Sequence, residues 1–198
     1  MMESALMRLM LVVTAVLTMV CASKAAVQAF PEGRSWLGTR TELHADGRRL
    51  TVKDAKGGTL GFFIAEPGGM SLRGLVVSNA GDQLVIDAKA LFKEGATKLV
   101  FRACDLDVNA LGGRNATILG EVEAPRGSEF DFLFEGHGQG HYYRTKELKG
   151  MARRRTYRMM ADVETGLRDL HLRVDVRRQG DGGSVKLGAF TIGTFEEQ

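Results

Sequence analysis

From Phe30 onward the chain alternates between apolar and polar residues with a period of two. Leu170, Leu172, Val174 and Val176 fall on one side of such a pattern, and the polar residues between them fall on the other. This alternation predicts strands with one buried face. The strands predicted in this way are residues 41–45, 49–53, 60–65, 72–78, 83–88, 98–105, 117–123, 130–134, 156–163, 170–176 and 185–195.

The segments between these strands are rich in Gly and Asp, which favour tight turns because Gly reaches positive φ and Asp bonds to its own backbone. Residues 87–94 predict a helix of at most two turns, and no longer helical pattern follows residue 30. Many strands with no helices between them exclude a parallel βαβ fold. We therefore predict an all-β fold, an antiparallel β-sandwich of the jelly-roll type, formed by residues 30–198 as a single domain.

Residues 1–29 have a different pattern. Arg8 precedes the apolar run 9–20, and small residues follow, which is the order of a cleavable secretory signal helix. The apolar run is too short for a stable membrane span. Cleavage after Ala25 or Ala29 fits the preference for small residues, and Cys21 offers the alternative of a lipoprotein anchor. The chain is therefore expected to be secreted or periplasmic.

Composition narrows the function classes. The 27 Lys and Arg residues against 24 Asp and Glu residues give a net charge of +3, which is too small and dispersed for a dedicated nucleic-acid binder. The 25 glycines against 3 prolines agree with many short strands and tight turns. Cleavage of the signal leaves Cys104 as the one cysteine, so no intramolecular disulfide is expected in a monomer. Cys104 lies in an apolar run and is predicted to be a buried small residue.

Residues 84–195 resemble a galactose-binding-like β-sandwich of the carbohydrate-binding-module type. The resemblance lies in Phe92-Lys93-Glu94-Gly95 followed by the strand 97–103, in Thr156-Tyr157-Arg158-Met159, and in the closing strands 170–175 and 185–192. It implies a carbohydrate ligand. Such domains often hold a structural calcium ion through an acidic residue in the last strand, where this chain reads Lys186-Leu187-Gly188-Ala189-Phe190. No cofactor is predicted, and calcium stays open only as a structural ion.

The segment 135–144 is the richest polar stretch of the chain. It follows an apolar strand and combines His, Tyr, Gln and Arg with three glycines, which predicts a recognition loop at the rim of a sandwich. Tyr rings can stack on sugars, while the polar groups can bond hydroxyls or a uronic carboxylate. The alternative is a solvated hairpin loop. The predicted ligand-binding residues are Gln139, His141, Tyr142, Tyr143 and Arg144, with Trp36 as an extra platform.

No catalytic residue and no metal ligand is assigned. His137 and His141 are four residues apart, a spacing that brings two imidazoles together on a helix, but the glycines oppose a helix and no Asp is fixed nearby in the sequence. Glycoside hydrolysis needs two carboxylates across a cleft. Five acidic residues are expected on neighbouring strands and to alternate to one side, without a defined pair: Glu121, Glu123, Glu129, Asp131 and Glu135.

Basic residues concentrate at 146–158. Arg153, Arg154, Arg155 and Arg158 lie close to Lys146 and Lys149. This cluster fits an acidic polysaccharide or an anionic membrane surface. It equally fits an exposed turn that keeps an edge strand from pairing with other chains.

The sequence as a whole predicts a secreted, non-catalytic protein that binds an extracellular glycan. Two alternatives stay open. One is a small glycan-active enzyme of β-sandwich fold, a hydrolase or a lyase, which uses an unassigned carboxylate pair or a His141 and Tyr143 acid/base set. The other is a structural protein of the cell envelope.

Overall fold

The computed structural model describes residues 27–31, 33 and 35–194, with the backbone alone for residues 104, 105 and 141–145. The elements are β1 (Val27–Phe30), β2 (Arg40–Leu43), β3 (Leu50–Lys53), β4 (Thr59–Glu66), β5 (Val76–Ala80), β6 (Gln83–Asp87), α2 (Lys89–Lys93), β7 (Lys98–Asp105), α3 (Val108–Leu111), β8 (Asn115–Glu123), β9 (Glu129–His137), β10 (His141–Lys149), β11 (Arg155–Asp162), β12 (Asp169–Arg178) and β13 (Val185–Thr194). None of the helices in the described residues is long and apolar enough to cross a membrane.

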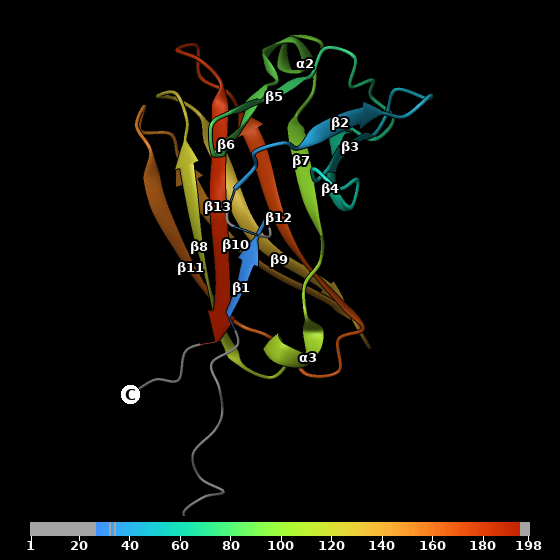
Figure 1. The fold of residues 1–198 in the computed structure, drawn as a ribbon, viewed down its shortest axis with the longest axis vertical. Helices are drawn as coiled ribbons and strands as arrows, with labels where there is room; N and C mark the ends of the chain where they lie inside the picture. The colour runs from blue at the N-terminus through green and yellow to red at the C-terminus, as the bar shows by residue number, and fades with distance from the viewer. Residues whose placement is uncertain (1–26, 32, 34, 195–198) are drawn as a thin grey trace, which may run out of the picture.

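The strands form two antiparallel sheets that pack as a β-sandwich, which confirms the predicted fold class (Figure 1). The first sheet has the order β11-β8-β13-β6-β5, with β1 beside β13. The second sheet has the order β10-β9-β12-β7-β4-β3-β2. After β6 every connection carries the chain into the other sheet except the β9–β10 hairpin. Crossing connections of this kind are found in Greek-key and jelly-roll sandwiches.

The segment 135–144 is not a loop, and this part of the prediction is wrong. β9 continues to His137 and β10 begins at His141, so residues 138–140 form the connection. Gly138 donates its backbone N–H to the carbonyl of Gly140 over 2.9 Å. Gly138 lies against the connection between β11 and β12, where a Cβ would come within 2.6 Å of the Gly166 carbonyl, and the flanking residues complete a nine-residue ladder between the two strands.

The first sheet begins before residue 30. β1 pairs Val27–Phe30 with Phe190–Gly193 of β13, so the folded domain includes residues that the sequence assigned to the signal. Cleavage after Ala29 would remove three of the four residues of β1, whereas cleavage after Ala25 would keep the strand whole. Cys21 and the apolar run of the predicted signal lie outside the described residues, as does the side chain of Cys104.

The core lies between the sheets and takes its largest side chains from alternate strand positions. Phe130, Phe132 and Phe134 of β9 are fully buried, as the period-two pattern predicts. Across the sandwich, Phe190 of β13 meets Phe132 edge-on, with ring centroids 5.4 Å apart. Gly120 of β8 lies beneath this pair, and a Cβ there would come within 2.5 Å of the Phe190 ring. A side chain at residue 120 is therefore incompatible with this packing.

Trp36 belongs to this core, and its ring offers no surface to a ligand. Its exposed fraction is 0%, and it packs edge-on against Phe30 and Phe101. The indole N–H donates to the carbonyl of Gly188 over 2.8 Å. The prediction that Trp36 is a stacking platform is therefore wrong, because a platform needs one exposed ring face.

Candidate functional site: the outer face of the second sheet

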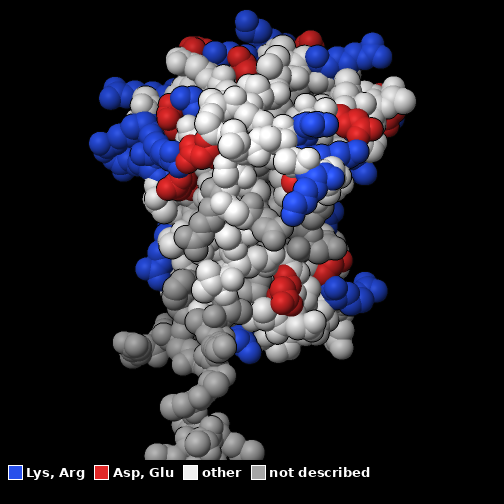
Figure 2. All heavy atoms as spheres, in the orientation of Figure 1, with Lys and Arg blue, Asp and Glu red and all other residues white. Residues whose placement is uncertain are grey.

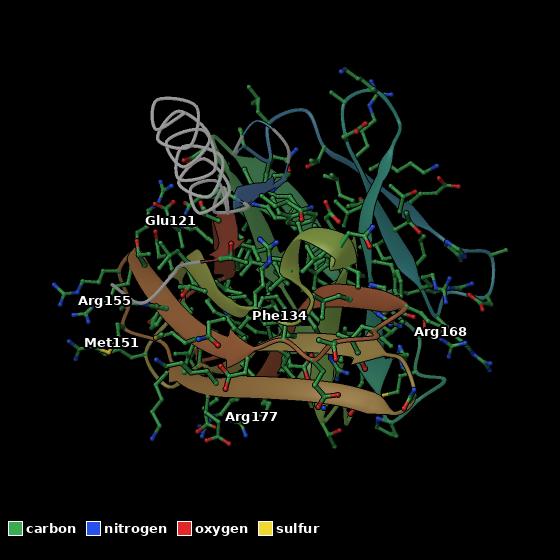
Figure 3. All side chains as sticks on the ribbon, turned by 90° about the horizontal axis from the view of Figure 1, so that it is seen from below. Glu121, Phe134, Met151, Arg155, Arg168 and Arg177 are labelled. Atoms are coloured by element: carbon green, nitrogen blue, oxygen red, sulfur yellow. The ribbon has the colours of Figure 1, made fainter. Side chains whose placement is uncertain are left out.

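The second sheet carries charged residues on the face that points away from the core. On β9 and β12 these residues alternate with the buried apolar ones, so that Phe134 lies between the sheets while Arg177 lies at the outside of the molecule (Figure 3). The register places Asp131 opposite Asp175 and Glu135 opposite His171. The outward positions of the two strands are Glu129, Asp131, Leu133, Glu135 and His137 on β9, and Asp169, His171, Arg173, Asp175 and Arg177 on β12.

Arg173 is at the centre of an ion-pair network on this face. Its Nε and Nη2 donate to the two carboxylate oxygens of Asp175 over 2.6 and 2.8 Å, and its Nη1 donates to Glu135 over 3.3 Å. Lys98 of β7 joins the network through Asp175, at 3.3 Å, and Glu66 of β4, at 3.1 Å. The Asp175 side chain is 1% exposed and that of Arg173 is 13% exposed. Arg173 and Asp175 are therefore held in fixed positions with little access to water, whereas the Glu66 side chain is 41% exposed.

Arg177 and Arg102 extend the network on either side of Arg173. Arg177 contacts Asp131 at 3.2 Å and the exposed Glu147 of β10 at 3.2 Å. Arg102 of β7 lies 3.6 Å from Glu135. Three buried atoms of this part of the network, the Nε atoms of Arg102 and Arg177 and the Oδ1 atom of Asp131, have no hydrogen-bond partner in the described part of the chain. The outer face thus keeps unused hydrogen-bonding capacity among its ion pairs.

Burial changes the proton affinities of this network. Desolvation raises the pKa of Asp131, and the neighbouring charges of Asp175 and Glu147 add to this increase against the opposing charge of Arg177. For Lys98, burial opposes the charged form, but the bond to Glu66 and the charge of Asp175 outweigh it and raise the pKa. Asp131 therefore takes up a proton at a higher pH than an exposed aspartate does.

The raised pKa of Asp131 predicts a pH-dependent effect of Asp131→Asn. A carboxyl with a raised pKa in the folded state makes the fold less stable as pH rises. The free energy of unfolding falls between the ordinary pKa of 3.8 and the higher pKa of the folded state. The variant lacks this loss. We expect the free energy of unfolding of Asp131→Asn, minus that of the unchanged protein, to increase between pH 4 and pH 7 in urea titrations. A difference that stays constant or falls over this range would contradict the burial of this carboxyl.

At one end of the face, two histidines surround one carboxylate. Asp169 of β12 is the register partner of His137 of β9, and its Oδ1 lies 2.8 Å from Nδ1 of His137 and 3.4 Å from Nε2 of His171. The same oxygen accepts the backbone N–H of His137 over 3.0 Å. Desolvation works against the ionised form of Asp169, but the bond to His137 and the charges of both histidines outweigh it and lower the pKa. The expectation that no Asp lies near His137 is wrong, because strand pairing brings Asp169 into contact with it.

The predicted recognition residues lie next to this face, on the β9–β10 hairpin. Gln139 is exposed in the turn. His141 and Tyr143 are the register partners of His137 and Glu135. Their side chains lie outside the described part of the structure, and so do those of Tyr142 and Arg144. The backbone therefore brings the hairpin residues to the edge of the ion-pair network, while Trp36 is separated from it in the core.

The candidate carboxylates do not share one face. Glu121 and Glu123 belong to β8 of the first sheet, whereas Glu129, Asp131 and Glu135 belong to β9 of the second. The expectation that all five alternate to one side is therefore wrong, because the β8–β9 connection crosses between the sheets. Strand pairing places Asp131 beside two other acidic residues, Asp175 of β12 and Glu147 of β10, and no sequence motif links the three.

The basic residues at 146–158 lie along two sheet edges, β10 of the second sheet and β11 of the first. Figure 2 shows Lys and Arg side chains gathered at the side of the molecule where β11 lies, next to acidic ones. Lys146 donates its Nζ to the carbonyl of Arg158 over 2.8 Å. Arg154 pairs with Asp82 and Glu121. This arrangement favours edge protection, since Lys146 occupies a backbone acceptor that another strand would use.

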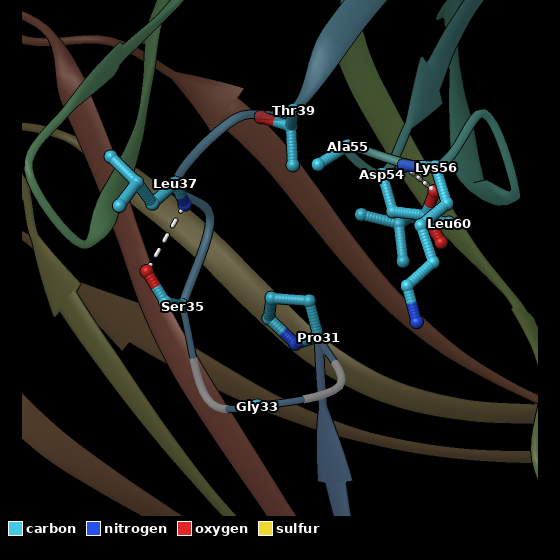
Figure 4. A pocket seen from close by; sticks show the side chains of 9 residues that line it. All are labelled: Pro31, Gly33, Ser35, Leu37, Thr39, Asp54, Ala55, Lys56 and Leu60. Atoms are coloured by element: carbon cyan, nitrogen blue, oxygen red, sulfur yellow. Dashed lines mark hydrogen bonds between the residues drawn. The ribbon is translucent and has the colours of Figure 1, made fainter.

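A pocket of about 300 Å³ lies away from this face, between the segment after β1 and the β3–β4 turn (Figure 4). Two of its polar side chains, those of Asp54 and Ser35, are engaged in local turns. Asp54 accepts the backbone N–H groups of Lys56 and Gly58 over 2.8 Å each, and Ser35 accepts that of Leu37 over 3.0 Å. Groups that complete their own turns offer little to a ligand.

No family model matches the sequence, and no curated protein does. Among solved structures, the chain is similar to a xylan-binding domain of carbohydrate-binding module family 22, with 10% identity, a TM-score of 0.41 and coverage of 61% of this chain and 80% of that chain. The C-terminal family 22 module of Clostridium thermocellum Xyn10B gives 12% identity and a TM-score of 0.42, with coverage of 61% of this chain and 80% of that chain. A family 61 module in complex with β-1,4-galactotriose gives 11% identity and a TM-score of 0.33, with coverage of 88% of this chain and 90% of that chain. These are modules of the class that residues 84–195 resemble.

Proposed function

We propose that this chain is an exported β-sandwich protein that binds a glycan, without catalysis, on the outer face of the second sheet and the adjoining β9–β10 hairpin. Cleavage of the signal after Ala25 would deliver the domain with β1 intact. The observation that carries the proposal is the half-buried ion-pair network centred on Arg173. The proposed site consists of this network and the hairpin residues Gln139, His141, Tyr142, Tyr143 and Arg144.

A network of this kind suits a ligand with many hydroxyl groups. Hydroxyls both donate and accept, and the face presents guanidinium donors beside carboxylate acceptors within a few ångströms of each other. Charge-assisted hydrogen bonds are stronger than neutral ones. Because Arg173 and Glu135 already hold each other in place, a ligand would not have to order these long side chains on binding.

The hairpin supplies residue types that the network lacks. Sugar rings stack on aromatic side chains, and the outward positions of β9 and β12 contain none. Tyr143 is paired in register with Glu135, which contacts both Arg102 and Arg173. Successive residues of a strand point to opposite faces, and Tyr143 is the one in register with the outward residue Glu135. We infer that Tyr143 provides the apolar contact and that the network provides the polar contacts.

The second candidate is a glycan-active enzyme, and one observation favours it. Asp131 and Asp175 face each other across paired strands, where Cβ atoms lie about 5 Å apart, and the pKa of Asp131 is raised. Carboxyl groups about 5 Å apart serve retaining glycosidases. The burial of Asp175 opposes this function, because a carboxylate that is 1% exposed and bonded twice to Arg173 cannot reach a sugar carbon. Binding without turnover is therefore the better supported function.

The test is a glycan array probed with the purified mature domain, followed by titration calorimetry with the glycan retained. We expect Tyr143→Ala to weaken binding about tenfold, since an aromatic contact contributes about 1 kcal/mol or more. Arg158→Ala is the matched control, because Arg158 is exposed on β11, in the other sheet.

Each outcome decides between the candidates. Binding that Tyr143→Ala weakens and Arg158→Ala does not would support the proposed site. Release of reducing ends or unsaturated products from the bound glycan would replace the proposal with the enzyme. A folded protein that binds no glycan on the array would overturn the proposal and favour the structural alternative. Equal affinities of the two variants would place the ligand elsewhere.

A further inference from the structure

The cluster of His137, Asp169 and His171 contains one more histidine than a His–Asp ion pair requires. A single His–Asp contact would be complete with His137 and Asp169. His171 is two residues after Asp169 on β12, so both point to the outer face, and pairing with β9 adds His137 to the same point. Each residue offers one imidazole nitrogen or carboxylate oxygen, and these three atoms all lie within 4.8 Å of one another. Two imidazoles and one carboxylate thus converge from two paired strands.

We propose that His137, Asp169 and His171 bind a divalent transition-metal ion, with Zn²⁺ as the ion expected. Ligand atoms around a tetrahedral Zn²⁺ ion at 2.0–2.1 Å lie about 3.3 Å apart. The separations from Asp169 Oδ1 are 2.8 Å to His137 and 3.4 Å to His171, and the two imidazole nitrogens lie within 4.8 Å of each other. Each separation is therefore within about 1.5 Å of the tetrahedral value. Small rotations of the side chains remove such differences while the strands stay in place.

The donor set selects the class of ion. Imidazole nitrogen is a ligand for Zn²⁺ and similar transition ions, whereas Ca²⁺ and Mg²⁺ take oxygen ligands. Three protein ligands leave at least one coordination position for water or another oxygen. Side-chain exposures of 41% for His137 and 37% for Asp169, against 11% for His171, leave an approach from solvent. The ion would therefore sit at the surface, anchored on its inner side by His171.

Strand pairing holds the three residues in position. Asp169 accepts the backbone N–H of His137, and Arg168 donates its own backbone N–H to the carbonyl of His137 over 2.6 Å. These bonds fix the ends of β9 and β12 relative to each other. A site on two paired strands is more rigid than one on loops, so metal binding should not require the chain to reorganise.

The experiment is a titration of the metal-free mature domain, prepared without a polyhistidine tag, with Zn²⁺ in a calorimeter. We expect one ion per chain. Replacing an outer-shell partner of a metal commonly lowers affinity 10- to 100-fold, so removal of a ligand itself in His171→Ala, His137→Ala or Asp169→Asn should weaken binding at least tenfold. Absorption of bound Co²⁺ is the second readout, because its visible bands report nitrogen ligation and coordination number.

His44→Ala is the matched control, because His44 lies on the β2–β3 connection and bonds to Thr51. Its Zn²⁺ affinity should equal that of the unchanged protein. No binding of Zn²⁺, or equal losses in His44→Ala and His137→Ala, would overturn the proposal. Asp169→Asn keeps the shape of the side chain, and its circular dichroism spectrum shows whether lost binding comes from a lost ligand. Unchanged Zn²⁺ affinity in folded Asp169→Asn would exclude the carboxylate from the site.

Discussion

Trp36→Ala is expected to lower the free energy of unfolding by about 3–5 kcal/mol, the range for removal of a buried large aromatic side chain. The indole fills the space between Phe30, Phe101 and β13, and its removal leaves both a cavity and the carbonyl of Gly188 without its partner. Urea denaturation followed by circular dichroism measures the loss, because Trp36 is the one tryptophan of the chain and its fluorescence disappears with it.

Two further variants make this result specific. Leu37→Ala changes the next residue, which is 71% exposed, and should alter stability by less than about 0.5 kcal/mol. Trp36→Phe keeps an aromatic ring and should lose less than Trp36→Ala, which covers the case in which the alanine variant does not fold. A Trp36→Ala protein as stable as the unchanged one, with weakened glycan binding, would restore Trp36 as a ligand platform.

The second large effect is expected for Asp175→Ala, which should destabilise the fold by about 3 kcal/mol or more. Removing one partner of a buried ion pair leaves the other charge without compensation, and here Arg173 loses two hydrogen bonds while Lys98 loses a neighbouring carboxylate. Because the carboxylate is 1% exposed, water cannot replace it. The free energy of unfolding in urea is the measurement, and a high salt concentration should change the difference little.

Glu147→Ala is the control for Asp175→Ala. Glu147 also pairs with an arginine, Arg177, but its side chain is 73% exposed. Surface pairs contribute about 0–1 kcal/mol, and salt weakens them further. If both variants lost equally little, the network on the outer face would be open to solvent, and its donors would not be preorganised for a ligand.

The sequence allowed the strands and the orientation of their side chains to be predicted, since a period of two is a local property. Residues 98–105 were predicted with the bounds that β7 has, and the alternation of Phe130, Phe132 and Phe134 gave the core face of β9. The hairpin residues were predicted as a polar recognition segment but with the wrong conformation. Three glycines indicate a turn equally well in a long loop and in a short connection, so only strand pairing distinguishes the two.

The candidate site depended on contacts between residues far apart in the chain. A strand pattern shows which residues share a face but leaves open which strand lies beside it, and a shift in register would change every partner. Asp169 and His171 could be read as two outward residues of one strand, yet their proximity to His137 follows from the pairing of β12 with β9. Trp36 shows the opposite case, because an isolated aromatic residue outside any strand gives no local sign of burial.

The sequence by itself therefore determined the β-sandwich class, the alternation of core and outer positions and the polar character of the β9–β10 segment. The tertiary structure decided that Trp36 is a core residue and that Asp175 is a buried charge paired with the partly buried Arg173. It also decided that His137 and His171 lie beside the carboxylate of Asp169. The physical reason is that backbone preference and hydrophobic periodicity act over a few residues. Burial, ion pairing and ligand geometry arise where strands from distant parts of the chain come into register.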